Sequence, residues 1–436
     1  MSARTILRGR TLSYLRAPEA IDDCDAWVFE DDGAVVIADG MIVEAGSFAT
    51  IARQTGDTIV DHRPHLIMAG FIDAHAHFPQ MQVIGSYGAE LLDWLNNYTF
   101  PAETRFADEA HAHRIAAAFL DEMVRQGTTT SAVYCTVHPQ SAEAFFSAAL
   151  ARDMRMIAGK VMMDRNAPAA LTDTATRGHD ETEALIARWH GRGRLGYAIT
   201  PRFAITSTPA QLEAAGALAR RHPDCHVQTH LSENAAEIAY TLSLYPDCAD
   251  YTAIYERYGL TGRKSLFGHC IHLSDREADA LHDSGSVAVF CPTSNLFLGS
   301  GLHPYQTFRR RAKPVRSAIA TDVGGGTNYS MLRTLDEGYK VIALKGEKLD
   351  PMRAFWQATR GNAEALSIAD RVGSIAAGMD ADLVVLDARA TPGMRLRMET
   401  VETLAEELFL LQTLGDDRAV AETYVAGRAA KSGLAG

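Results

Sequence analysis

The sequence lacks the features that would place this protein in a membrane or on nucleic acid. No segment of its 436 residues reaches the ~18 uninterrupted apolar residues of a membrane span. Lysine and arginine total 42 against 54 aspartates and glutamates, and the net charge of -12 disfavours binding to phosphate backbones. Residues 1–20 scatter arginines among apolar residues and so lack the apolar core of a secretory signal. We therefore predict a cytoplasmic protein, without membrane or nucleic-acid partners, that binds a neutral or cationic small molecule.

Cysteine is scarce and dispersed. No two cysteines form a C-x-x-C pair, and free buried thiols are the default in a reducing compartment. The spacing also excludes the class of zinc enzymes built on an H-x-E helix followed by P-C-x-x-C. The six cysteines are Cys24, Cys135, Cys225, Cys248, Cys270 and Cys291.

The two ends of the chain share one character. Residues 1–65 contain short alternating stretches with glycine at the turns, which indicate small antiparallel strands, and residues 377–388 and 421–430 resemble them. Between the last two, apolar residues from Val401 to Phe409 recur at helical spacing. We predict that residues 1–65 and 372–436 together build one small β-sandwich domain.

The middle of the chain, residues 66–371, predicts an α/β fold. Eight apolar strand candidates alternate with Ala/Leu-rich helical stretches, a pattern typical of a (β/α)₈ TIM-type barrel, which carries its chemistry at the carboxyl ends of the strands. The candidates are 66–77, 128–135, 155–163, 195–203, 225–233, 265–270, 286–294 and 317–322.

Polar residues stand at the carboxyl ends of these candidates. His75 and His77 end the first; alternation puts both on one strand face, about 7 Å apart along the backbone. Taken singly, His230, His269 and Asp322 are each explained better by a hydrogen-bonded core or turn position. Because these polar residues all stand at the same end of the strands, together they indicate a catalytic site. Besides His75 and His77 they are Arg202, His230, Glu233, His269 and Asp322.

Three of these histidines and one aspartate form a zinc ligand set. Catalytic zinc is bound by imidazole nitrogen and carboxylate oxygen and keeps one position for water. His75, His77, His230 and Asp322 supply three neutral nitrogens and one anion, and the bound water then deprotonates near neutral pH. Glu233 needs no metal role and is placed as a general acid/base. We predict a metal-dependent hydrolase with one Zn²⁺ per chain.

Eight segments of the sequence form recognisable motifs: "GFIDAHAHFPQ" (70–80), "SYGAELLDWLNNYTFPAE" (86–103), "GKVMMD" (159–164), "TPRFAITST" (200–208), "QTHLSEN" (228–234), "FGHC" (267–270), "CPTSNLFLGSG" (291–301) and "TDVGGGT" (321–327). Through them the sequence resembles the guanine deaminases of the amidohydrolase superfamily over essentially its whole length. H-x-H on the first strand and Asp on the eighth are general to the superfamily, whereas "LLDWLNNYTFPAE" and "TPRF" are far more specific.

The resemblance implies hydrolysis of guanine to xanthine and ammonia by a metal-activated water. Asp322 would take the proton of that water, Glu233 would protonate the ring nitrogen, and His269 would orient the water or stabilise the oxyanion.

The resemblance also implies the substrate contacts. Gln80 and Arg202 would bind the purine edges; Arg can only donate, so it suits the ring carbonyl. Phe203 would pack on the ring and Trp94 would belong to a covering lid, although a core position explains these two equally well.

Other interpretations concern the metal count, the substrate and the assembly. Some superfamily members bridge two metals with a carboxylated lysine at the end of strand four, but Lys160 lies on strand three, where we expect a buried ion pair. An alternative substrate is another amino-heterocycle, such as a triazine, a pterin or an adenosine-like base. A non-catalytic scaffold would be expected to have lost a ligand, and all are present. Family members are often homodimers, so a homodimer is the assembly implied.

Overall fold

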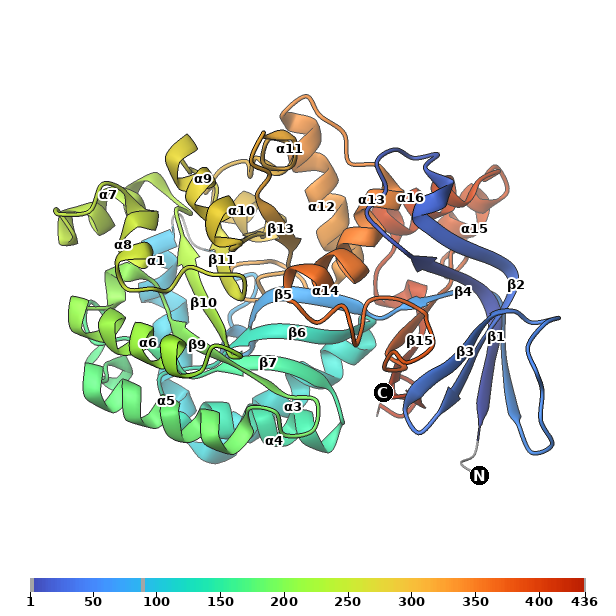
Figure 1. Ribbon diagram of the computed structural model, residues 1–436, viewed down its shortest axis with the longest axis horizontal. Helices are drawn as coiled ribbons and strands as arrows, with labels where there is room; N and C mark the ends of the chain where they lie inside the picture. Colours follow the sequence, from blue (N-terminus) through green and yellow to red (C-terminus); the bar gives the residue numbers. More distant parts are fainter. Residues whose placement is uncertain (1–3, 88–90, 435–436) are drawn as a thin grey trace.

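Figure 1 shows the computed structural model, in which residues 4–87 and 91–434 are described. A barrel with its covering helices lies on the left of the view, and the blue strands of the amino-terminal part lie on the right. The strands form two sheets, one for each part. Within the described residues, every helix is too short or too polar to cross a membrane.

The barrel contains all eight predicted strands, parallel and in chain order, which confirms the predicted fold. Nearly every residue of these strands is buried, as expected where helices cover a parallel sheet, and this explains their continuous apolar runs. A two-residue strand, β8 (Val161–Met162), pairs with β9 alone. The eight are β5 (Phe71–His77), β6 (Thr128–Tyr134), β7 (Arg155–Gly159), β9 (Gly196–Pro201), β10 (His226–Leu231), β11 (Ser265–His269), β12 (Val287–Phe290) and β13 (Arg316–Ile319).

Backbone hydrogen bonds just beyond β13 bring the last strand back to the first. The amide of Asp322 donates to the carbonyl of His75 (2.9 Å), and the amide of His77 donates to the carbonyl of Val323 (3.3 Å). The seam between the first and last strands is therefore held beside the histidines of β5.

Amphipathic helices surround the barrel. In α6, for example, Thr208 caps the first turn by accepting from the amide of Gln211, Pro209 occupies the first turn, and Leu212, Ala215 and Leu218 face inward. The long helices are α3 (Glu109–Arg125), α4 (Pro139–Ala151), α5 (Ala175–Trp189), α6 (Pro209–Arg221), α9 (Asp275–Ser284) and α12 (Met331–Leu344). The shorter ones are α1 (Leu91–Trp94), α2 (Phe100–Thr104), α7 (Ala235–Leu244), α8 (Tyr251–Arg257), α10 (Pro292–Phe297), α11 (Tyr305–Arg310), α13 (Pro351–Trp356) and α14 (Asn362–Ala365).

Both chain ends contribute to the second sheet. Its seven strands are hydrogen-bonded as one mixed sheet in the order β16-β15-β14-β4-β1-β2-β3. The predicted boundary falls at residue 65, whereas β4 stays in this sheet to Ala69, directly before β5. These strands are β1 (Thr5–Tyr14), β2 (Trp27–Ala38), β3 (Met41–Ser47), β4 (Thr58–Ala69), β14 (Leu383–Leu386), β15 (Val420–Val425) and β16 (Arg428–Ala429). Helices α15 (Pro392–Met398) and α16 (Leu404–Leu414) lie between β14 and β15, and α16 is the predicted helix.

A buried ion cluster joins the two parts. Asp380, three residues before the start of β14, accepts from Arg155 at the start of β7 (2.6 Å) and from Arg194 just before β9 (3.1 Å). Asp382 accepts from the same Arg194 at 2.8 Å. Both carboxylates are buried, so removing one partner would leave an uncompensated charge in the interior, a strongly destabilising change.

Candidate active site

The four predicted ligands converge at the carboxyl end of the barrel. Nε2 of His75 lies 3.1 Å from Nε2 of His77, which lies 3.3 Å from Nε2 of His230. Oδ1 of Asp322 lies 3.3 Å from Nε2 of His75 and 3.4 Å from Nε2 of His77. These atoms come from β5, β10 and the segment after β13, which the barrel brings together although they are far apart in the sequence.

The spacing of these atoms fits a metal ion. Four ligands at zinc's usual bond lengths lie about 3.3 Å apart at the corners of a tetrahedron. Burial lowers the pKa of His75, His77 and His230, so the imidazoles are neutral and their lone pairs are available. Nδ1–H of His230 donates to the carbonyl of Arg202 at 2.7 Å, which leaves its Nε2 unprotonated.

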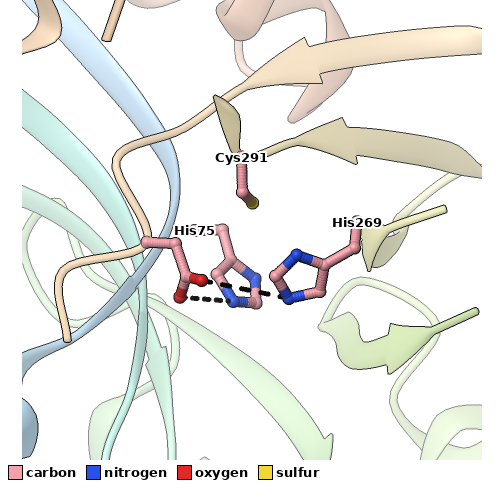
Figure 2. Close-up of side chains that lie close together, drawn as sticks. His75, His269 and Cys291 are labelled. Carbon is pink, nitrogen blue, oxygen red and sulfur yellow. Dashed lines mark ion pairs between the residues drawn. The ribbon is translucent and has the colours of Figure 1, made fainter. Parts of the chain in front are cut away.

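A thiol lies beside the same group. Figure 2 shows the side chain of Cys291 directed toward the imidazoles of His75 and His269. Ligand atoms of these three residues and of Asp322 all lie within 4.8 Å of one another. Burial raises the pKa of the Cys291 thiol well above its ordinary value, which keeps the sulfur protonated and a poor ligand. Because the thiol is protonated, the neutral imidazoles of His75, His77 and His230 together with the carboxylate of Asp322 fit a metal better.

Glu233 and His269 form a second pair at the edge of this group. Oε2 of Glu233 lies 3.3 Å from Nε2 of His269, and Oε1 accepts from Ser300 at 3.0 Å. Burial raises the pKa of Glu233 to about 7, against the opposing effect of His269. For His269, burial acts to lower the pKa, but the carboxylates of Glu233 and Asp322 outweigh it and raise the pKa. Nδ1 of His269 faces Oδ1 of Asn295 at 3.0 Å, which leaves Nε2 directed at Glu233.

Several strand ends around the site have left-handed backbone. Ser232, His269, Cys270 and Asp322 have positive φ angles between 50° and 72°. For residues with a side chain this region costs of order 1–3 kcal/mol each and is typical of functional sites. At His269 and Asp322 the unusual backbone sets the direction of a side chain that belongs to the site.

A hollow that is partly open to solvent lies over these groups. Gln80, Trp94, Arg202 and Phe203, the four predicted substrate contacts, all line it. Trp94 and Phe203 also belong to one buried apolar cluster, so the core and pocket explanations both hold for them. Trp94 lies in a covering segment of residues 91–104, made of α1, a π-helix (Leu95–Thr99) and α2. Residues 88–90 of the quoted motif lie outside the described range.

The sequence reasoning missed one buried carboxylate, Glu103, at the end of the covering segment. Its Oε1 accepts from Gln80 at 3.0 Å and from Arg202 at 2.8 Å. Glu103 is the last residue of the quoted "LLDWLNNYTFPAE" motif, so that motif was the available signal. Asn295, which is hydrogen-bonded to His269, and Ser300, which donates to Glu233, were missed as well. Both follow β12 within the quoted "CPTSNLFLGSG".

The predicted buried ion pair of Lys160 is confirmed. Its Nζ lies 2.8 Å from Oδ2 of Asp173 and 3.2 Å from Oε2 of Glu181, and the lysine is fully buried. Gln211 donates to the other oxygen of Asp173 at 2.7 Å. This ammonium is held by its own carboxylates and is not available as a bridging ligand.

Comparisons with known proteins agree with this geometry. The family model described as "Amidohydrolase family" matches residues 66–430. A guanine deaminase of Escherichia coli (strain K12) is 45% identical over 434 residues, with 98% of each chain covered.

Solved structures give the same result. E. coli guanine deaminase matches with a TM-score of 0.94 at 44% identity, over 98% of this chain and 99% of that one. Guanine deaminase from C. acetobutylicum, solved with guanine bound in its active site, matches with a TM-score of 0.88 at 29% identity, over 98% and 99% of the two chains.

Proposed function

We propose that this chain, which belongs to the amidohydrolase family, hydrolyses guanine to xanthine and ammonia with one zinc ion. Water adds its oxygen to the ring carbon that carries the amino group, the carbon–nitrogen bond breaks, and the amine leaves with a proton as ammonia. The observation that carries the proposal is the shared pocket: three members of the ligand set (His77, His230 and Asp322), the pair of Glu233 and His269, and Arg202 line one hollow.

The ligand set has a distinct chemical task. Zinc bound by His75, His77, His230 and Asp322 would lower the pKa of a water ligand to about 7. Asp322 can accept the proton of the attacking water, because its Oδ2 faces His269 at 3.9 Å while its Oδ1 faces the two histidines of β5. Burial would raise the pKa of Asp322, but its bond to His75 and the other facing imidazoles hold it at about 2, so the side chain is ionised.

Glu233 and His269 handle the remaining proton and the developing charge. A carboxyl group with a pKa of about 7 can both donate and accept near neutral pH, so Glu233 can protonate the ring nitrogen and then accept the proton of the new hydroxyl as it becomes the carbonyl. The proton that Asp322 took from the water passes to the amine, which leaves as ammonia. His269 lies within reach of both carboxylates, where its Nε2 can orient the water or stabilise the oxyanion.

The opposite wall of the pocket would bind the purine. Arg202 donates to the ring carbonyl, Gln80 bonds the neighbouring edge, and Phe203 and Trp94 pack on the ring. The neutral purine also fits the apolar character of much of this lining, which includes Leu91, Leu95 and Leu298 as well.

The test is turnover by purified, zinc-loaded protein, with xanthine and ammonia measured from guanine. Equal amounts of the two products are expected. Turnover of a triazine or an adenosine-like base but not of guanine would assign a different amidohydrolase activity. Absence of turnover with all of these compounds would support a non-catalytic scaffold.

Location and assembly remain predictions. All six cysteines are unpaired, which supports a reducing compartment and hence the proposed cytoplasmic location. We propose a homodimer from the family resemblance, to be checked by light scattering of the purified protein.

A further inference from the structure

Glu103 is a fully buried carboxylate that none of the proposed chemical steps uses. Both of its oxygens accept from Nη1 of Arg202 at 2.8 Å, and Oε1 also accepts from Nε2 of Gln80 at 3.0 Å. Gln80 and Arg202 line the pocket, whereas Glu103 is not among the described residues that do. It therefore acts behind two pocket residues that are far apart in sequence.

Glu103 decides which end of the Gln80 amide faces the pocket. A carboxylate only accepts, so the amide nitrogen of Gln80 must point to it and Oε1 must point away. Oε1 has no hydrogen-bond partner among the described residues, and it lies close to Gly324, where a Cβ would approach it to 2.0 Å. Because Gly324 has a φ of +121°, the backbone at this position suits glycine alone. The amide is thus held between Glu103 and Gly324 in the pocket wall, with its acceptor unpaired among the described residues.

Glu103 also orients the guanidinium of Arg202. Both bonds to the carboxylate use Nη1, and the group lies over the ring of Phe100 at 5.6 Å. Nε and Nη2 make no hydrogen bond within the described part of the chain. The pocket wall therefore presents the donors of Arg202 beside the acceptor of Gln80.

We propose that Glu103 is a positioning residue that makes this wall specific for a ring lactam, an N–H next to a carbonyl. The inference rests on the proposed function, in which the N–H and carbonyl beside the reacting carbon of guanine meet Gln80 and Arg202. 2-Aminopurine carries the same reactive amino group but has a bare ring nitrogen in place of the N–H and no carbonyl. The lone pair of this ring nitrogen would face the lone pair of Oε1 of Gln80.

The test is Glu103→Gln, which keeps the size and removes the obligatory acceptor. The new amide can donate to Oε1 of Gln80, so the Gln80 amide can invert and present its N–H₂ to the pocket. We expect kcat/KM for guanine to fall about 10- to 10²-fold, the cost of losing hydrogen bonds to a charged group. The value for 2-aminopurine should stay constant or rise, and where turnover is too slow its inhibition constant against guanine should show the same trend.

Glu407→Gln is the matched control. Glu407 is also a buried glutamate paired with an arginine, Arg10, at 2.7 Å, but it lies in α16, outside the barrel. It should change neither substrate preference nor zinc content. Glu103→Gln should likewise retain its zinc, since Glu103 makes no contact with the ligand set among its hydrogen bonds.

An equal loss for guanine and 2-aminopurine would overturn the proposal and leave Glu103 a structural residue. Failure of the wild-type protein to deaminate guanine would instead overturn the proposed function, which is a separate result. Should Glu103→Gln not fold, Gln80→Met removes the acceptor and leaves the Glu103–Arg202 pair intact. The kcat/KM for guanine should then fall about tenfold or more, while the value for 2-aminopurine should not fall. Parallel losses for the two substrates would again contradict the proposal.

Discussion

The carboxylate of Glu233 lies 3.3 Å from the imidazole of His269, and both side chains are buried beside the ligand set without belonging to it. The acid/base pair is therefore separate from the metal ligands, and only Asp322 is assigned to both proton transfer and metal binding. Single substitutions can separate the two functions.

Glu233→Gln should abolish most turnover while the metal stays bound. A general acid/base contributes about 10²-fold or more, so kcat should fall by at least that factor with KM little changed. Steady-state kinetics together with metal analysis of the same sample check this. Loss of zinc, or normal turnover, would show that the role given to Glu233 is wrong.

His230→Ala should remove the metal and the activity together, because His230 supplies one of three nitrogen ligands. Elemental analysis should find one equivalent of zinc in the wild-type protein and far less in the variant. His113→Ala, an exposed histidine outside the site, is the control and should keep both metal and activity. Two equivalents per chain, with Lys160 carboxylated, would contradict the single-metal site.

Guanine should be strongly preferred to adenine. Adenine would place an amino donor, or no partner, against the guanidinium of Arg202, and buried hydrogen-bonding sites reject such analogues by about 10⁴-fold. Arg202→Ala should lower kcat/KM mainly for guanine. The kcat/KM values for guanine, adenine, cytosine and melamine check this; a better rate with adenine or melamine would refute the guanine assignment and leave the hydrolase class intact.

His226 predicts a loss of stability at acid pH that is separate from catalysis. It begins β10, its Nε2–H donates to the carbonyl of Leu366 at 2.7 Å, and burial lowers its pKa from 6.5 to about 4. Below about pH 6.5 the unfolded chain therefore binds a proton at His226 that the folded state does not bind. The free energy of unfolding is highest above that pH and decreases as the pH falls toward 4.

Urea unfolding at pH 7.5 and pH 5 measures this effect. His226→Gln keeps a donor for Leu366 but cannot titrate, so the wild-type protein should lose about 2 kcal/mol more than the variant between the two pH values. The metal ligands are the same in both proteins, and their contribution cancels in the difference. Equal losses would show that His226 accepts its proton in the folded state.

The strands and the ligands could be predicted because their signals are local. Parallel strands covered on both faces are continuous apolar runs, and His75 and His77 share one strand face. Glu103 could not be found in this way, since it meets Arg202 from 99 residues away and only after the covering segment has folded over the pocket. Cys291 is correctly predicted as a buried free thiol, but its position next to His75 and His269 depends on how strands β5, β11 and β12 are arranged around the barrel.

Closure of the barrel and binding of the proposed ion share the same residues. The amide of Asp322 donates to the carbonyl of His75, and the side chains of the same two residues belong to the ligand set. A slip at this seam would carry one ligand away from the others, so only the closed barrel can hold the ion tightly. By mass action, an ion at about one hundred times its dissociation constant would favour that closed form by about 2.7 kcal/mol. The catalytic ion would then also serve as a clasp, and its removal would loosen the barrel first at the strand pair that carries the chemistry.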